Sequence, residues 1–291
     1  MTKTFKIVIL AKQVPDTRNV GKNAMKEDGT VNRAALPAIF NPEDMNALEQ
    51  ALRLKDRYPG SEVLLLTMGP SRAAEIIREG LFRGADGGVL LTDRKFAGAD
   101  TLATSYALSM AIRKMQPDII IAGRQAIDGD TAQVGPQVAE KLNIPQVTYA
   151  EDIINFENEK LTIKRRLERG IEIVKTPVPV LITVHATAAP CRPRNAKQLM
   201  KYKHARTLTE EQDNEHNSYL PVYSLDYLRI PEWGVIDVGG DEINYGLSGS
   251  PTKVKKIENI VFQAKESKKL TSCDEDIEGL IKELISSHTI G

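Results

Sequence analysis

The sequence predicts an α/β fold: a parallel, doubly wound nucleotide-binding sheet with an antiparallel strand extension and a C-terminal arm. Short apolar, β-rich runs alternate with helix-period segments up to Pro145, which is typical of parallel strands joined by crossover helices. After Pro145, strand-like runs follow one another with only short turns between them, which is typical of antiparallel pairing. The chain of 291 residues is 41% apolar, so it can bury a large core.

The parallel part of the sheet is expected from alternating strands and helices. Asn41 is the predicted side-chain cap of the first helix, with proline at the next position and two acidic residues after it, as helix starts favour. The predicted strands cover 5–11, 62–67, 88–91 and 118–122, and the helices begin at Pro42, run through Ile76 and Ile77, and cover 100–114 and about 131–141.

The second half of the chain gives the antiparallel extension and the arm. Antiparallel strands are expected at 147–154, 161–167 and 171–174, a last apolar strand at 180–184, and a helix at 274–285. Residues 207–218 are polar and acidic, which predicts an exposed insertion, and the wider insertion at 204–244 has no functional interpretation. We divide the chain into an α/β nucleotide-binding domain at 1–190 and a partner-binding region at 191–291.

Composition excludes several classes of function. The 39 basic and 39 acidic side chains cancel, which argues against a nucleic-acid-binding protein. No apolar run reaches the roughly 18 to 20 residues of a membrane helix, and the first residues run straight into a strand with no room for a signal peptide, so a cytoplasmic protein is expected. The four histidines and two cysteines are scattered without ligand spacing, so no metal site is predicted.

The segment 123–136 is the strongest candidate for a binding site. It follows a predicted central strand and opens a helix, and ligands bind at that edge of a parallel sheet. Free N–H groups at the helix start, with Gly123 and Gly129 permitting close approach, would form an anion cradle. Asp128 and Asp130 suit a bare phosphate badly and would instead cap the helix or bind ribose hydroxyls or a cation. A glycine-rich turn without any ligand explains this loop equally well.

Two common nucleotide-binding motifs are missing. The first strand is followed by Lys12-Gln-Val-Pro-Asp16 rather than by G-x-G-x-x-G, which argues against a dehydrogenase-type dinucleotide fold. No G-x-x-x-x-G-K-[ST] sequence occurs, which also argues against a P-loop nucleotidase. A nucleotide in this protein must be bound in another way.

Five segments of the chain form a recognisable series in their order and spacing: Ala11-Lys-Gln-Val-Pro-Asp16; Asn41-Pro-Glu-Asp44 with Ala51-Leu-Arg-Leu-Lys55; Met68-Gly-Pro70 followed by Gly84-Ala-Asp86; Gln125-Ala-Ile-Asp-Gly-Asp-Thr-Ala-Gln-Val-Gly135; and Ile163-Lys-Arg-Arg-Leu-Glu-Arg-Gly-Ile-Glu172 leading to Pro177-Val-Pro-Val-Leu-Ile-Thr183. Through these segments the chain resembles, over nearly its whole length, the β subunit of electron transfer flavoproteins.

The resemblance implies a heterodimer with an α subunit that carries the electron-transferring FAD. It also implies a second nucleotide in the β subunit, which is structural AMP in housekeeping members and FAD in electron-bifurcating members, where it accepts hydride from NADH. The loop at 128–136 and the segment 98–105 are similar to the FAD-binding group, so we expect FAD. No catalytic acid, base or nucleophile is expected.

The expected cofactor contacts follow from matching the family's motifs to this chain. Arg124 would stabilise a reduced, anionic flavin ring, or it is a surface arginine bound to a phosphate or to a carboxylate of the partner chain. The segment with Asp100, Thr101 and Thr104 would contact the flavin, or it is a capped amphipathic helix. The full set of expected cofactor-binding residues is Leu10, Ala11, Lys12, Asn41, Asp44, Met68, Asp100, Thr101, Thr104, Gly123, Arg124, Gln125, Ala126, Asp128, Gly129, Asp130, Thr131, Ala132, Gln133 and Val134.

Residues 190–203 align with the family's recognition loop, which docks on a dehydrogenase. Family members often have a larger apolar anchor near the position of Ala196, so Leu199 and Met200 would supply the apolar contact here. Basic residues would steer an acidic partner, an acyl-CoA dehydrogenase or another flavin-dependent dehydrogenase. The expected partner-binding residues are Arg194, Ala196, Lys197, Leu199, Met200 and Lys201.

Two alternatives remain beside an electron carrier with FAD in the β subunit. One is a non-bifurcating housekeeping subunit whose AMP only stabilises the fold. The other, outside the family, is a stand-alone nucleotide-binding sensor or hydrolase of similar architecture.

Overall fold

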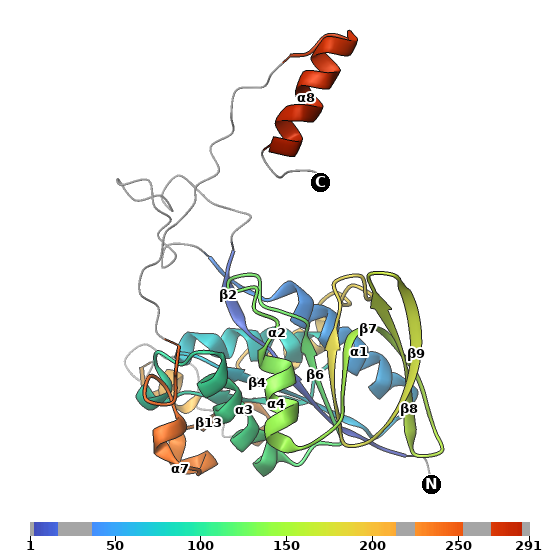
Figure 1. Ribbon diagram of the computed structural model, residues 1–291. Helices are drawn as coiled ribbons and strands as arrows, with labels where there is room; N and C mark the ends of the chain where they lie inside the picture. The colour runs from blue at the N-terminus through green and yellow to red at the C-terminus, as the bar shows by residue number, and fades with distance from the viewer. Residues whose placement is uncertain (1–2, 17–36, 214–224, 253–268, 287–291) are drawn as a thin grey trace.

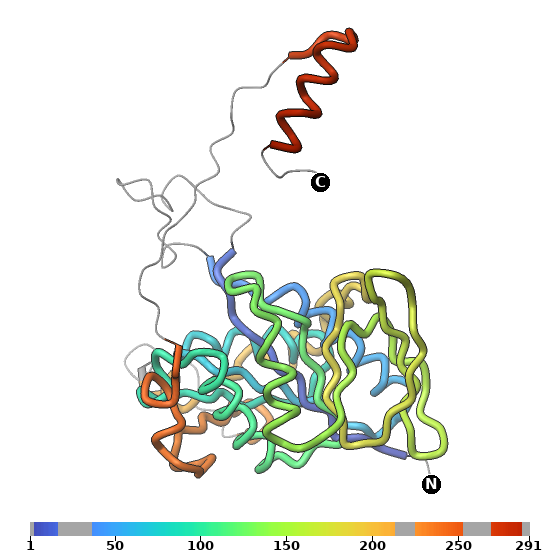
Figure 2. Tube along the Cα trace, in the orientation of Figure 1, coloured from blue at the N-terminus to red at the C-terminus, as the bar shows by residue number. Residues whose placement is uncertain are grey.

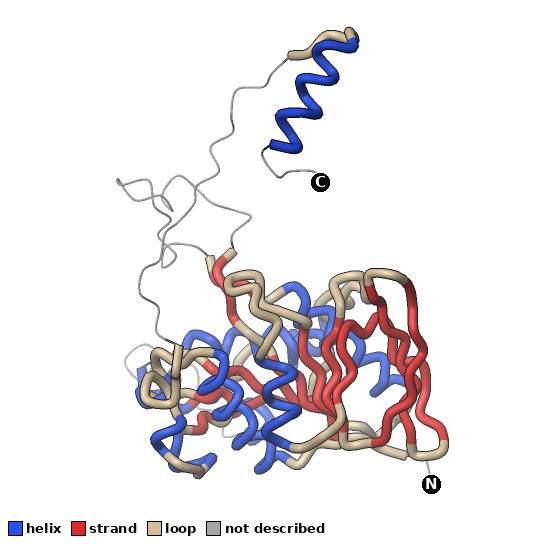
Figure 3. The backbone as a smooth tube through the Cα atoms, viewed as in Figure 1, coloured by secondary structure: helices blue, strands red, loops and turns tan. Residues whose placement is uncertain are grey.

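The computed structural model describes residues 3–16, 37–213, 225–252 and 269–286. Its centre is a nine-stranded sheet in the order β13-β5-β4-β1-β6-β10-β7-β8-β9, which runs across the molecule with helices on both faces (Figures 1 and 3). This confirms the predicted fold class.

Seven neighbouring strands of this sheet pair parallel, the last of them being β7 (Gln146–Glu157), which also begins the antiparallel extension. Strands β6 and β10 are buried along their whole length, as expected for parallel strands covered on both faces. In spatial order the other parallel strands are β13 (Glu232–Trp233), β5 (Gly87–Leu91), β4 (Glu62–Met68), β1 (Lys6–Leu10), β6 (Ile119–Gly123) and β10 (Val180–Val184).

Helices cover both faces, and the alternation of strand side chains explains why. In β1, Ile7 and Ile9 belong to the core cluster that contains helices α1 (Pro42–Arg57) and α2 (Ala74–Arg83). Val8 and Leu10 belong to the opposite cluster, which contains α3 (Thr101–Met115), α4 (Val134–Leu142) and α7 (Val235–Val238). The period of two along the strand thus serves two helix layers.

The antiparallel extension lies at one end of the sheet. Strands β7 (Gln146–Glu157), β8 (Lys160–Leu167) and β9 (Gly170–Pro177) pair antiparallel in sequence, which confirms the predicted pattern. Strand β10 then returns to lie between β6 and β7 and is parallel to both.

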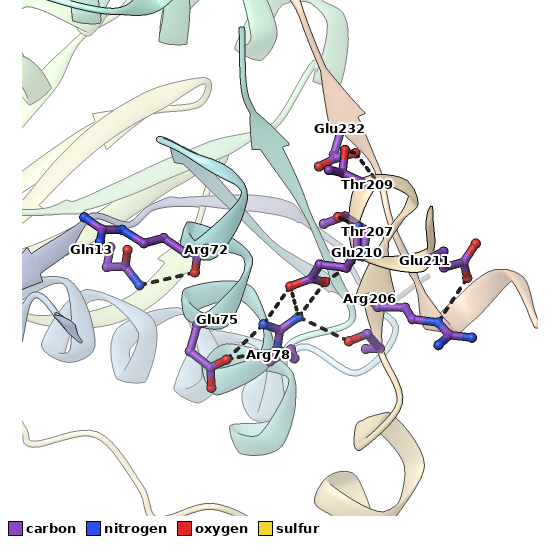
Figure 4. A network of polar contacts seen from close by, with 11 residues as sticks. Gln13, Arg72, Glu75, Arg78, Arg206, Thr207, Thr209, Glu210, Glu211 and Glu232 are labelled. Carbon is purple, nitrogen blue, oxygen red and sulfur yellow. Dashed lines mark hydrogen bonds and ion pairs between the residues drawn. The ribbon is translucent and has the colours of Figure 1, made fainter. Parts of the chain in front are cut away.

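At the opposite edge, the segment after residue 205 packs on α2 and β5. Arg78 of α2 hydrogen-bonds Glu210 at 2.9 Å and Glu75 at 2.9 Å (Figure 4). Thr207 is fully buried, and the carboxylate of Glu232 accepts a hydrogen bond from the Thr209 hydroxyl at 2.7 Å. The prediction of an exposed insertion is therefore wrong for Thr207, which is buried, and for residues 209–211, which are half-buried, whereas Leu208 and Gln212 are exposed as predicted. Thr209 and Glu210 are covered because they bond to β13 and α2.

The later chain also supplies the edge strand of the sheet. Residues of β13 pair with β5, and the trace of 225–252 runs beside that of 90–115 (Figure 2). The remaining elements are β2 (Gln13–Pro15), β3 (Ala38–Phe40), α5 (Ala196–Tyr202), β11 (Arg206–Thr207), α6 (Leu208–Asp213), β12 (Arg229–Ile230), α8 (Asp274–Ser286) and 3-10 turns at Ser71–Ala73, Arg94–Phe96, Asp226–Leu228 and Glu242–Asn244. Helix α8 confirms the predicted last helix.

Candidate nucleotide site

The site is built on the carboxyl ends of three adjacent parallel strands. Strand β1 lies between β4 and β6, so the chain leaves all three at the same edge of the sheet. The predicted residues Leu10, Met68 and Gly123 are the last residues of these strands. The structure therefore brings together segments that are far apart in the sequence.

Asp44, in the first turn of α1, ties two of these strand ends together. Its carboxylate accepts hydrogen bonds from the backbone N–H groups of Lys12 and Gly123, each at 2.9 Å. Burial raises the pKa of Asp44 to about 7, and the two N–H donors oppose that rise. Asp44 is only 6% exposed, so its contact is with the protein's own backbone.

The absence of a side chain at Gly123 serves this junction. A Cβ there would lie 2.4 Å from Asp44 Oδ1 and 2.7 Å from the Glu43 carbonyl carbon. The missing side chain at Gly123 thus admits the start of α1, and its contact with a ligand remains a prediction.

The role of Asn41 differs from the predicted helix cap. Its side chain makes no cap hydrogen bond to α1. Instead, its amide nitrogen donates to the Gln125 carbonyl at 2.8 Å, and its oxygen accepts from the Ile127 N–H at 3.2 Å. Pro42 still suits the first helical position, because proline has no N–H to satisfy there and its φ is already helical. Asn41 thus holds the 125–127 loop against α1.

Glu43, which the sequence analysis did not assign to the site, pairs with the predicted Arg124. Glu43 Oε1 lies 3.0 Å from Arg124 Nη2, and Oε2 accepts the Gln125 N–H at 3.1 Å. The Glu43 side chain is 8% exposed and that of Arg124 is 28% exposed. The positive charge of Arg124 is therefore balanced within the chain. The Asn41–Asp44 motif was the signal that could have identified Glu43.

The two acidic residues of the loop both bond to side chains of this chain. Lys12 Nζ lies 2.7 Å from Asp128 Oδ1, and Gln125 Nε2 donates to Asp130 Oδ1 at 2.9 Å. Because both carboxylates already have partners, they would repel a nearby phosphate less than the sequence alone suggests. Asp130 and Ala132 have φ of 48° and 53°, so the helix begins at Val134 and not near 131.

The start of α4 is open. Gln133 is its N-cap residue but makes no side-chain cap hydrogen bond, and the first turn has no acidic residue. N–H groups at a helix start have no partner within the helix, and they carry the positive end of the helix dipole. Nothing lies within 4 Å of a Cβ built on Gly129, in the preceding turn. This combination suits an anion such as a phosphate.

The start of α3 is closed. Asp100 Oδ1 accepts hydrogen bonds from the N–H groups of Leu102 at 2.9 Å and Ala103 at 3.0 Å. The capped-helix interpretation is therefore confirmed for Asp100, whose pKa is lowered by backbone hydrogen bonds although partial desolvation raises it.

The starts of α3 and α4 are joined by a polar contact. The Thr101 hydroxyl donates to Gln133 Oε1 at 2.8 Å, and Gln137 Nε2 lies 3.4 Å from the same hydroxyl. Gln137 Oε1 is buried and has no hydrogen-bond partner among the described residues. Such an acceptor is expected to meet a donor. Gln137 was not predicted; its place one turn after Gln133 is the signal that could have found it.

The other predicted cofactor residues line the same loops and strand ends. Leu10 and Ala11 are buried; Met68, Thr104, Ala126, Ala132 and Val134 are half-buried; and Thr131 is exposed. Their contacts with a cofactor remain predictions.

The predicted partner-binding segment forms α5, which packs beside α2. Arg194 pairs with Glu79, so its charge is balanced within the chain. Ala196, Lys197 and Lys201 are exposed, as is Met200 at 62%, whereas Leu199 is half-buried. Met200 is therefore the more accessible of the two expected apolar contacts.

The described residues contain no group of three or more His, Cys, Asp and Glu side chains placed to hold a metal ion. None of their helices is both long and apolar enough to cross a membrane.

Comparison with known proteins gives a consistent family. The electron transfer flavoprotein domain matches residues 28–209. The chain is 44% identical over 250 residues to the electron transfer flavoprotein subunit beta of Clostridium acetobutylicum, covering 86% of each chain. It is 50% identical over 251 residues to the caffeyl-CoA reductase-Etf complex subunit CarD of Acetobacterium woodii, again 86% of each. Over 296 residues it is 41% identical to the acryloyl-CoA reductase electron transfer subunit gamma of Anaerotignum propionicum, covering 98% of this chain and 100% of the other. The chain therefore belongs to the electron transfer flavoprotein family, among its β subunits.

Proposed function

We propose that this chain pairs with an α subunit to carry electrons between a dehydrogenase and an acceptor, with FAD in the site at the carboxyl edge of the sheet. In this proposal that FAD accepts hydride from NADH, as in electron-bifurcating members. The uncapped start of α4, joined to the capped start of α3 through Thr101 and Gln133, is the observation that carries the nucleotide assignment.

The residues present fit the diphosphate of such a ligand. The open N–H groups at the start of α4 are donors, and its first turn holds no acid to repel a phosphate. Lys12 offsets the charge of Asp128. The open space beside Gly129 leaves room for close approach to the backbone.

The neighbouring groups fit the hydroxyl-bearing part of a flavin nucleotide. Thr101 and Thr104 supply neutral hydroxyls, and the buried acceptor Gln137 Oε1 has no donor among the described residues. When bound, FAD supplies a ring that takes up hydride and passes electrons on. Arg124 would hold positive charge near the site at any working pH, moderated by its pair with Glu43.

The names of two relatives support the reductase-linked version. CarD is named as a subunit of a caffeyl-CoA reductase-Etf complex, and the A. propionicum relative as an electron transfer subunit of acryloyl-CoA reductase. We propose a flavin-dependent acyl-CoA dehydrogenase or reductase as the partner, with the exposed face of α5, including Lys197, Met200 and Lys201, as part of the contact.

The alternative within the family is a housekeeping subunit with structural AMP. The open start of α4 suits one phosphate as well as two, so the test must count nucleotides. The full chain is co-expressed with its α subunit, purified and heat-denatured, and the released FAD and AMP are quantified per heterodimer.

Two FAD per heterodimer would support the proposal and lead to an anaerobic titration with NADH. One FAD with one AMP would refute the NADH-oxidising part and make the protein a housekeeping shuttle. A stable monomer that binds ATP without a flavin partner would refute the family role and favour a stand-alone sensor or hydrolase.

A further inference from the structure

Asp100 is held from two sides, and one of them comes from far along the chain. While Oδ1 caps α3, Oδ2 accepts the N–H of Thr252 at 3.1 Å. The N–H of Asp100 itself donates to Ser250 Oγ at 2.8 Å. These residues are 150 and 152 positions apart in the sequence. The closed start of α3 thus depends on the turn at 245–252.

This turn is fixed by its own packing. Tyr245 is 1% exposed, and its ring packs edge-on against Phe96 at 5.3 Å and Tyr106 at 5.0 Å. Gly246 has φ of 53°, and a Cβ there would lie 2.1 Å from the Lys95 carbonyl oxygen. The turn is therefore wedged between the residues before α3 and the body of that helix, where a larger residue at 246 would not fit.

Ser250 connects the turn to Asp100 directly. It is 4% exposed, and its hydroxyl donates to the Gly246 carbonyl at 2.6 Å while it accepts from Asp100. A buried hydroxyl that is used as both donor and acceptor has a fixed direction. Ser250 therefore sets the position of the Asp100 backbone and not merely its charge.

We propose that Ser250 and the Thr252 N–H are positioning groups for the nucleotide site, acting through Asp100 on the first turn of α3. Thr101 follows Asp100 directly, and its hydroxyl is bonded to Gln133 at the start of α4. Fixing Asp100 therefore fixes the hydroxyl that faces α4. This inference rests on the proposed function, because it assigns these residues to nucleotide binding at the same site.

The proposal has a reciprocal consequence. If the turn at 245–252 favours bound nucleotide through Asp100, bound nucleotide must favour the ordered turn by the same factor. Amide hydrogen exchange at 245–252 should therefore slow when AMP or FAD is added, although neither Ser250 nor Thr252 needs to contact the ligand.

The test compares two serines of the same turn. Ser250→Ala removes the acceptor for Asp100, whereas the matched control Ser248→Ala removes a hydroxyl that donates to the Tyr245 carbonyl at 2.8 Å. Each full-length variant, co-expressed with the α subunit and freed of nucleotide, is titrated with AMP and with FAD by calorimetry, and exchange at 98–105 and 245–252 is followed with and without nucleotide.

We expect Ser250→Ala to weaken nucleotide binding about tenfold and Ser248→Ala to change it less than about twofold. Unchanged affinity in Ser250→Ala, or nucleotide that leaves exchange at 245–252 unaltered in the wild type, would overturn the inference. Should Ser250→Ala fail to fold, Ser250→Cys keeps the shape of the side chain, slightly enlarged, with a weaker acceptor, and this variant is expected to bind nucleotide more weakly than the wild type. Wild-type protein that binds neither AMP nor FAD would instead refute the proposed function, and this inference with it.

Discussion

The starts of α3 and α4 lie at the same edge of the sheet, but only one of them has a side-chain cap. Helix α3 receives the carboxylate of Asp100, which takes up two of its free N–H groups. Helix α4 receives no side-chain cap and no acid in its first turn. Thr101 and Gln133 join the two, so the difference occurs within one small region.

This difference separates a structural helix start from one left for a ligand. A cap typically contributes about 1 kcal/mol to stability, and α4 forgoes it. An anion that binds such free N–H groups stabilises the folded state, so the missing cap is offset when the ligand is bound. The phosphate of a nucleotide is therefore expected at α4, and the hydroxyl-bearing part nearer to α3.

The largest effect is expected at Gly129, beside the open helix start. Gly129→Glu places a carboxylate where we expect phosphate, and it should lower nucleotide affinity at least about 100-fold, so that purified heterodimer loses one nucleotide. The fold should tolerate the change, because a Cβ at 129 meets nothing within 4 Å and φ is not positive. Released nucleotide is quantified beside Gly129→Ala, which should retain it. Full occupancy in Gly129→Glu would show that the pocket lies elsewhere.

A pH-dependent effect is expected from Asp44, at a third helix start on the same edge. Its pKa is raised from 3.8 to about 7, so between these two pH values the folded state holds a proton that the unfolded chain releases. This contribution is complete at low pH and is lost as pH rises through 7. Between pH ~6 and pH ~8 it should lower the free energy of unfolding by about 1.4 kcal/mol.

Asp44→Asn isolates that contribution, because asparagine does not titrate. Urea unfolding of both proteins at the two pH values should show the extra decline only in the wild type. Equal declines would mean that Asp44 does not change protonation in this range.

A smaller effect tests the two caps directly. Asp100→Ala should reduce the free energy of unfolding of the nucleotide-free protein by about 1 kcal/mol, because it leaves two N–H groups of α3 without a cap. Gln133→Ala should cost less than about 0.5 kcal/mol, because Gln133 caps nothing. Urea titrations would measure both, and equal losses would remove the distinction between the helices.

The smallest effect runs in the opposite direction. Gln133→Asp puts a negative charge at the positive end of α4 and should stabilise the nucleotide-free protein by about 0.5 kcal/mol. The same charge should weaken nucleotide binding, which calorimetry would detect. A variant that gains stability and keeps full affinity would argue against phosphate at this helix.

Most of the fold could be predicted because hydrophobic periodicity is local. The strands, the crossover helices and the antiparallel extension each follow from runs of a few residues. The loop at 123–134 could also be located, because glycines and a helix start follow a buried strand. Nucleotide binding by that loop remains a prediction.

The errors concern contacts between distant segments. Asn41 has the residue type of a helix cap, yet its amide meets Gln125, which sequence spacing cannot show. The segment after Thr207 is acidic, which suggests exposure. In the structure, however, Glu210 pairs with Arg78, which lies 132 residues earlier in the sequence. The pairing of Glu43 with Arg124 was missed for the same reason.

The edge strand β13 has a consequence for the growing chain on the ribosome. Strand β5 is completed early, but the residues that cover its edge lie far downstream, and Val235 bonds Asp93 across 142 residues. At about 5–20 residues per second, β5 would wait roughly 7 to 28 s with its hydrogen-bonding edge open. Exposed strand edges invite pairing with other chains, so this interval is when the nascent protein is most open to aggregation or to the action of a chaperone.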